Sequence, residues 1–297
     1  MALGAKGTLF TGARATACLL WAASIVVLFL LDRQTSFFAL AVAAYAIFLI
    51  GMGAWLLPEA VPVETDDVLR AVGTGGFLAA RCVVVVVTAG LVYALGAALA
   101  GFENGVAVPL LTPLVRELGD IRLWRGVGGI ELFKLGLYVL VPAGLLLALG
   151  ARPRELGLCL PAPCTAVGTV ACLVPTVSFV GWGIGSGKLT GAAPIFLLVH
   201  NLLSNGFSEE FLCRGMIMSH LRAFVTAEWA VLIQAVIFAI MHFQLTGVEE
   251  RAAPWQSLAE DIALNMPIGL AFGYLALRSR SLLLPTLLHM FRWVPET

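Results

Sequence analysis

Charged side chains are scarce in this sequence: Asp, Glu, Lys and Arg make up 12% of its 297 residues, whereas hydrophobic residues make up 60%. With a mean hydropathy of +0.96, the chain lies outside the range of soluble globular proteins and within that of polytopic membrane proteins. Its net charge of zero gives no indication of a nucleic-acid partner. Arg dominates the basic residues, which suits a GC-rich bacterial genome. We therefore expect an integral protein of a bacterial plasma membrane, in contact with lipid.

Several familiar patterns are also missing. The six cysteines form no CxxC pair or zinc-ribbon spacing, and those inside apolar runs are expected to act as small hydrophobic residues. No HExxH sequence is present, so the common helical zinc-protease site is excluded. The first apolar run lacks a small-residue cleavage pattern at its end, so we predict a retained first span and no cleaved signal peptide.

Long apolar runs are abundant instead, and about 20 apolar residues suffice for a helix to cross a bilayer. We predict an all-α fold, a polytopic transmembrane helical bundle with about 8–9 spans. The candidate spans are 15–31, 36–57, 77–100, 128–150, 165–186, 192–222, 226–245, 258–277 and a short one at 281–294. The Pro- and Arg-rich segment 151–164 separates a variable N-terminal transmembrane region, 1–164, from a core, 165–297, that carries the chemistry. An interfacial amphipathic helix is expected within 101–127.

Only four histidines occur, at positions 200, 220, 242 and 289. His242 and His289 lie in strongly apolar stretches, VIFAIMHF and LLLPTLLHMF. Ionisable groups inside a membrane are costly and usually functional, although a histidine can also join two helices through a hydrogen bond. For each histidine taken alone, both interpretations stay open. His289 lies about one turn beyond Pro285, which fits the first turn of a short helix that reaches membrane depth.

A carboxylate is predicted to lie at the depth of His242. The segment RAFVTAEW around residue 225 is typical of a turn between two antiparallel spans. Thr226 can cap the second helix, and Glu228 then lies in its first turn, where the helix dipole favours an acid. Glu209 precedes the middle of this turn by as many residues as His242 follows it. Because both helices rise equally per residue, Glu209 and His242 should meet at one depth and could share a proton or a water molecule.

Two neighbouring charges, Glu210 and Arg214, have the i,i+4 spacing, acid first, that favours an ion pair on a helix. Such a pair can keep both charges in a low-dielectric setting. Glu209 lies about 100° round the helix from Glu210, so its carboxylate is suited to act as a general base. The alternative is that both acids serve the arginine as a structural triad.

Taken in order, these residues resemble the motifs of the CAAX-protease and bacteriocin-processing (CPBP) family of intramembrane proteases. The motif residues are Glu209, Glu210 and Arg214 (EExxxR), Phe238 and His242 (FxxxH), and the third histidine, His289. The resemblance covers about 190–294, roughly the last third of the chain. It departs at the final motif, usually HxxxN or HxxxD, because Trp293 occupies the fourth position after His289.

The resemblance implies hydrolysis of a peptide bond within the membrane, in a membrane-associated peptide or protein. Glu209 would take a proton from a water held between it and His242, and His289 would stabilise the oxyanion. The supporting residues implied by the motifs are Glu210, Arg214, Phe238 and Trp293.

The same three side chains, Glu209, His242 and His289, are also the ligand set of a catalytic zinc site with an open position. The resemblance leaves both mechanisms open, since the family is often described as metalloproteases and also resembles enzymes with a metal-free glutamate base. We favour the mechanism without a metal or other cofactor. If Glu209 were a Zn²⁺ ligand, Glu210 would have to be the base.

The departure at Trp293 leaves a second function open. In the family, the residue at this position is thought to help the histidine hold the oxyanion, and an indole N–H can donate a hydrogen bond but cannot accept one. Trp293 or Arg292 could substitute, and Asn205 and Asn265 are further polar candidates. Otherwise the chain has lost activity and serves as a membrane scaffold or immunity factor. A proton- or ion-coupled transporter would need paired broken helices or an inverted repeat, and the sequence shows neither.

Overall fold

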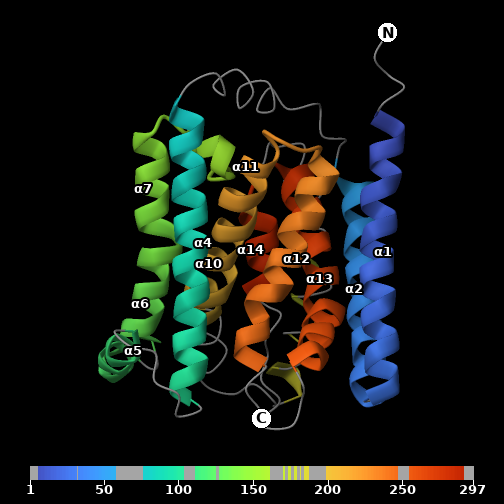
Figure 1. The fold of residues 1–297 in the computed structure, drawn as a ribbon, viewed down its shortest axis with the longest axis horizontal. Helices are drawn as coiled ribbons and strands as arrows, with labels where there is room; N and C mark the ends of the chain where they lie inside the picture. The colour runs from blue at the N-terminus through green and yellow to red at the C-terminus, as the bar shows by residue number, and fades with distance from the viewer. Residues whose placement is uncertain are drawn as a thin grey trace.

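The chain forms a bundle of helices, seen in a computed structural model (Figure 1). The structure describes residues 6–31, 33–57, 76–103, 111–124, 127–160, 199–246 and 254–290, together with isolated positions between 170 and 186. Apart from one short hairpin, the regular elements in these ranges are helices. The predicted all-α fold class is therefore confirmed.

The elements fall into two sets along the chain. The N-terminal set is α1 (Lys6–Leu31), α2 (Arg33–Leu56), α4 (Gly76–Glu103), α5 (Leu111–Asp120), the antiparallel hairpin of β1 (Arg122–Trp124) and β2 (Val127–Gly128), α6 (Gly129–Leu135), η1 (Gly136–Leu140), α7 (Val141–Ala148) and η2 (Pro153–Leu156). The C-terminal set is η3 (Leu202–Gly206), α10 (Phe207–Glu210), η4 (Phe211–Met218), α11 (Ser219–Leu221), α12 (Ala227–Thr246), α13 (Pro254–Ser279) and α14 (Leu283–Met290). The elements η1, η3 and η4 are π-helical, whereas η2 is a 3₁₀ turn.

The long helices run alongside one another, with the C-terminal set in the middle (Figure 1). α1 and α2 form one edge of the bundle, and α4, α6 and α7 form the other. Both edges pack on the middle: α1 and α2 contact α13, and α4 contacts α12 and η4. The C-terminal helices are therefore enclosed by protein on two sides.

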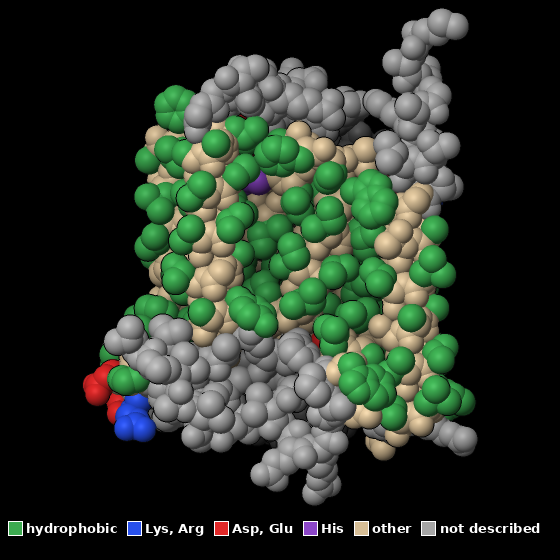
Figure 2. Space-filling model, in the orientation of Figure 1, with side chains coloured by type: hydrophobic (Ala, Val, Ile, Leu, Met, Phe, Trp, Pro, Cys, Tyr) green, Lys and Arg blue, Asp and Glu red, His purple; other side chains and the backbone are tan. Residues whose placement is uncertain are grey.

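Five helices in the described ranges are long and apolar enough to cross a membrane. They cover Gly12–Leu31, Gln34–Leu56, Phe77–Gly96, Glu131–Ala148 and Trp255–Ser279, and Ala227–His242 is a shorter apolar helix. The predicted count of 8–9 spans is not confirmed. Figure 2 shows hydrophobic side chains over most of the described surface on one face of the bundle, with a group of charged side chains at one lower corner. This distribution is what a lipid-facing surface requires.

The amphipathic helix expected within 101–127 is present as α5. It lies at one end of the bundle, beside α6 (Figure 1). That location is consistent with a helix at the membrane interface.

The helix α13 is much more deeply buried than α1, since 67% of an 18-residue stretch of its span is buried compared with 11% in α1. It contains Pro267, which has no backbone N–H and so cannot bond the carbonyl of Ala263 one turn earlier. The indole N–H of Trp21 on α1 donates to that carbonyl instead, at 3.2 Å. An N-terminal helix thus satisfies a backbone group that the proline would leave without a partner.

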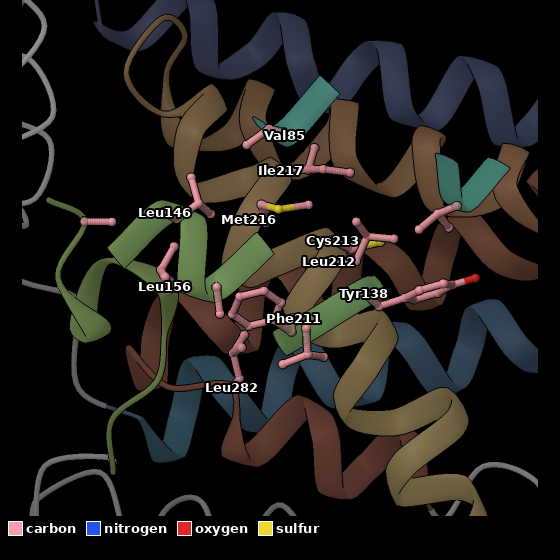
Figure 3. Close-up of a cluster of buried hydrophobic side chains, with 14 of the residues drawn as sticks. Val85, Tyr138, Leu146, Leu156, Phe211, Leu212, Cys213, Met216, Ile217 and Leu282 are labelled. Atoms are coloured by element: carbon pink, nitrogen blue, oxygen red, sulfur yellow. The ribbon is translucent and has the colours of Figure 1, made fainter. Parts of the chain in front are cut away.

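A second part of the core joins the N-terminal set to η4 (Figure 3). Leu146 of α7 and Leu156 of η2 are fully buried against Phe211 and Met216 of η4. A Cβ atom on Gly215 would lie 2.8 Å from the carbonyl oxygen of Leu156, so only glycine allows this approach. The predicted boundary between 164 and 165 lies outside the described residues, but helices from both sides of it share one core.

Candidate active site

Glu209 lies at the centre of the candidate site, on α10, a short α-helical stretch between the π-helical turns η3 and η4. Its Oε2 atom is 3.8 Å from Nε2 of His242 on α12. The same oxygen is 3.7 Å from Nε2 of His289 on α14. The structure thus brings together the three residues for which the sequence predicted catalytic roles. Both distances exceed that of a direct hydrogen bond.

Exposure differs among these three side chains. His289 is 1% exposed, whereas Glu209 is 13% and His242 is 21% exposed. The side chains of Glu209 and His242 are therefore the more accessible members of the site. π-Helical turns such as those flanking Glu209 are often found at functional sites.

The outer nitrogen of each histidine is held by an acceptor. Nδ1 of His242 lies 2.8 Å from the carbonyl oxygen of Phe238, and Nδ1 of His289 lies 2.8 Å from Oε1 of Glu210. A carbonyl can only accept a hydrogen bond, and so can an ionised carboxylate. Each Nδ1 atom therefore carries the hydrogen, which turns each Nε2 atom toward Glu209.

The predicted ion pair between Glu210 and Arg214 is present, with 2.8 Å between Oε1 and Nη1. It has a third member, because the same Oε1 atom also binds His289 at 2.8 Å. The sequence therefore predicts the pair of Glu210 and Arg214 but not its third member, His289. All three side chains are buried, and Glu210 couples the arginine to a histidine of the candidate site.

Arg214 contacts several other groups besides Glu210. Its second terminal nitrogen donates to the carbonyl oxygen of Gly269 on α13, at 3.1 Å. Its guanidinium carbon lies 4.7 Å from the ring centre of Phe238 and 5.6 Å from that of Phe272. Both distances suit cation–π attraction. The same two rings contact His289, with centres 5.9 Å and 5.5 Å from the imidazole, so they fix the arginine and the histidine together.

The helix α14 is positioned at both ends. α13 ends at Ser279, and the next residue, Arg280, has a left-handed φ of 54°. The Ser281 hydroxyl then accepts from the N–H of Leu283, the first residue of α14, at 3.1 Å, as a capping side chain does. At the other end, Asn201 donates its side-chain N–H to the carbonyl oxygen of Met290, at 3.2 Å. This carbonyl is one of those that a helix end leaves without a partner.

Sequence reasoning missed Asn201. The available signal was its spacing, because Asn201 and Asn205 precede Glu209 by two turns and one turn in an apolar segment. Asn201 is buried, and its side-chain oxygen accepts from the amide of Asn205 at 3.5 Å. Its contact with α14 could not be found from spacing, because the register of α14 against η3 is a tertiary feature.

The supporting residue Trp293 lies outside the described residues, and so does Arg292, its possible substitute. The structure does describe the other polar candidates. Asn205 lies beside Asn201 on η3, and Asn265 is buried in α13.

The side chains of the candidate site suit a zinc ion by donor type. Glu209, His242 and His289 offer one carboxylate and two imidazole nitrogens, and each histidine has the outer hydrogen bond typical of zinc-bound histidines. A zinc ion held by them would act as a Lewis acid. In the present arrangement, no three His, Cys, Asp or Glu side chains in the described ranges are disposed to hold an ion.

The apolar helices and this buried polar centre define an integral membrane protein with a candidate hydrolytic site among its C-terminal helices. Residues 191–292 match the family model described as "Type II CAAX prenyl endopeptidase Rce1-like". This third of the chain is an Rce1-like domain, as the resemblance to the CPBP family predicted. No curated protein and no solved structure matches the chain.

Proposed function

We propose that the protein is an intramembrane endopeptidase that hydrolyses a peptide bond of a membrane-associated peptide or protein. The observation that carries this proposal is the position of Glu209, whose Oε2 atom lies 3.8 Å and 3.7 Å from the Nε2 atoms of two histidines. The Rce1-like domain, whose family model is described as an endopeptidase, covers Glu209, His242 and His289. A bacterial plasma membrane remains the proposed location.

In the proposed reaction, a water molecule binds on the exposed side of the site between Glu209 and His242. Glu209 takes a proton as the water oxygen attacks the scissile carbonyl carbon, and His289 stabilises the resulting oxyanion. The C–N bond then breaks, and Glu209 returns the proton to the leaving amine. Water is the only co-reactant, and no cofactor takes part in these steps.

Glu210 and Arg214 support this reaction without contacting the water. Glu210 holds Nδ1 of His289, and Arg214 neutralises Glu210 while it bonds the backbone of α13. These contacts fix the direction of Nε2 of His289, and positioning of this kind is a large part of catalysis.

A Glu209→Gln variant tests the proposal. Glutamine keeps the size of the side chain but cannot take the proton, so cleavage should fall about 10²–10⁴-fold, the usual contribution of a general base. The measurement is cleavage of a farnesylated fluorogenic peptide ending in a CAAX sequence, with purified protein in liposomes. The matched control is Glu228→Gln, since this carboxylate only forms a partly exposed ion pair with Arg14. Equal cleavage by the wild-type chain and Glu209→Gln would exclude the proposal.

The metal question needs a separate measurement. The metal content of the purified protein is measured first, and its cleavage rate is then compared before and after chelator treatment and after zinc is added back. Under the mechanism proposed here, the cleavage rate should stay unchanged. Loss of activity with chelator and its recovery with zinc would assign Glu209, His242 and His289 to an ion instead.

The alternative, an inactive scaffold or immunity factor, is favoured by Trp293 where the family pattern has Asn or Asp. A Trp293→Asn variant distinguishes an inactive protein from an active endopeptidase. An activity that appears only in this variant would identify the natural chain as inactive, whereas cleavage by the wild-type chain excludes the alternative.

A further inference from the structure

A buried acid and amide lie in α13, outside the motifs of the candidate site. Asp261 is 1% exposed and Asn265 is 7% exposed, and both lie inside the candidate span Trp255–Ser279. The side-chain N–H of Asn265 donates to Oδ1 of Asp261 at 3.0 Å. An acid within a span is costly and usually functional, and the reaction proposed above does not use this one.

The pair faces the candidate site. Asp261 and Asn265 precede Phe272 by eleven and seven residues, so each of them points within about 20° of Phe272 on a helix of 3.6 residues per turn. The ring of Phe272 lies 5.5 Å from the imidazole of His289. The face of α13 that carries the acid and the amide is therefore the face turned toward the site.

The pair also lies at the depth of His242. α12 and α13 are antiparallel and closely packed: a Cβ atom on Gly269 would lie 2.9 Å from Cα of Ala235, and one on Gly273 would lie 2.6 Å from the amide nitrogen of Gln234. Equal rise per residue carries this register along both helices. His242, seven residues beyond Ala235, then lies level with positions 262–265 of α13.

A second hydrogen-bond donor would assist His289 there. Among the other two residues of the site, Nε2 of a neutral His242 whose Nδ1 carries the hydrogen is an acceptor, and so is the carboxylate of Glu209. The developing oxyanion of peptide hydrolysis is stabilised by donors. An asparagine amide has two N–H groups, and the bond from one of them to Asp261 fixes the plane of the amide.

On these grounds, and resting on the proposed function, we infer that Asn265 donates a hydrogen bond to the carbonyl oxygen of the substrate as it becomes an oxyanion, and that Asp261 is the positioning residue that orients this amide. Asn265 would then be a catalytic residue contributed by α13.

An Asn265→Leu variant tests this assignment. Leucine has the branched shape of asparagine and the same number of side-chain heavy atoms, and it suits an apolar bundle, so the fold should be kept while the donor is lost. Because the donor acts only in the transition state, kcat for the farnesylated CAAX peptide should fall about 10²–10³-fold with KM nearly constant. Asp261→Asn keeps an acceptor for Asn265 and should lower kcat less, by about tenfold. The matched control is Ser24→Ala, because Ser24 is buried and bonds only a carbonyl of its own helix, α1.

The outcomes separate this inference from the proposed function. If Glu209→Gln abolishes cleavage while Asn265→Leu keeps the wild-type kcat, only the role of Asn265 is wrong. An Asn265→Leu variant that melts earlier but turns over normally would identify the pair as a helix–helix contact. If kcat falls in Asn205→Ala but not in Asn265→Leu, the residue that donates to the oxyanion is Asn205 of η3. No cleavage by the wild-type chain, or equal cleavage by Glu209→Gln, overturns both proposals.

Discussion

Arg214 illustrates how much one side chain does in this site. Its fork binds Glu210 and the carbonyl of Gly269 at once, while its flat face lies over Phe238 and Phe272. A lysine has one compact charge and no flat face, so it cannot make these contacts together. An Arg214→Lys change would keep the positive charge but lose these contacts.

We therefore expect Arg214→Lys to lower the free energy of unfolding by about 1–3 kcal/mol, the cost of buried polar groups left without partners. Cleavage should fall as well, because Glu210 would hold His289 less firmly. Thermal unfolding in detergent and the peptide assay measure the two effects. Arg14→Lys, at an exposed ion pair, is the control and should change neither. A stable and active Arg214→Lys protein would contradict the described role of the fork.

At this scale the sequence predicted the contacts that depend on counting along one or two helices. The i,i+4 spacing gave the bond between Glu210 and Arg214, and equal distances from one turn placed Glu209 level with His242. The contacts of His289 with Glu210 and of Asn201 with Met290 were not predictable. They depend on how α14 packs against η3 and α10, and no sequence spacing encodes that packing.

At the scale of elements, the crossing of α12 and α13 depends on small residues. Gly269 lies against Ala235, and its carbonyl accepts from both Arg214 and Gln234. Small residues let membrane helices approach closely enough for such bonds. The glycine is therefore part of the support of the site, although it lies outside the EExxxR and FxxxH motifs.

Gly269→Ala should separate the two helices, since the added Cβ would lie 2.9 Å from the backbone of Ala235. Overpacking of this kind typically costs about 1–3 kcal/mol, and the bonds to the Gly269 carbonyl should lengthen. Gly90→Ala is the matched control, because a Cβ there would meet nothing within 4 Å; alanine favours a helix over glycine by about 0.5–1 kcal/mol. The expected thermal shifts are opposite in sign, and a destabilised Gly90→Ala beside an unchanged Gly269→Ala would refute this explanation.

At the scale of the whole molecule, the N-terminal half is part of the support of the candidate site. Arg81 of α4 donates to the carbonyl of Leu149 and forms a buried ion pair with Glu155, at 3.4 Å. Glu155 belongs to η2, whose Leu156 packs against η4, the element that carries Arg214. The buried ion pair of Arg81 and Glu155 thus connects α4 to η4 through the short turn η2.

Arg81→Ala should lower the free energy of unfolding by about 3–5 kcal/mol, because it leaves Glu155 buried without its nearest cation. Arg152→Ala removes the other cation beside the same carboxylate, but Arg152 is 56% exposed and 4.0 Å away, so its loss should cost about 1 kcal/mol or less. Chemical or thermal unfolding of the two variants in detergent gives the comparison. Equal stability of both would show that the buried pair does not hold the halves together.

At the scale of the whole membrane protein, the predicted count of 8–9 spans stays unconfirmed, and most of the predicted span 165–186 lies outside the described residues. Hydropathy counts every apolar run as a span, but α14 has eight residues, and the segment of Glu209 is divided among η3, α10 and η4. Neighbouring helices, rather than lipid, surround these elements, which is why they can carry charge and π-helical turns. The fold class followed from composition, whereas the arrangement of short inner helices depends on tertiary packing.

The central claim is that Glu209 and His242 act together on one water molecule. The most direct test is a double-mutant cycle of Glu209→Gln and His242→Ala, read as kcat for the farnesylated CAAX peptide in liposomes. Residues that act as a unit have strongly non-additive effects, so the double variant should be no slower than the slower single variant. Losses that multiply in the double variant, or single variants as fast as the wild-type chain, would contradict the claim.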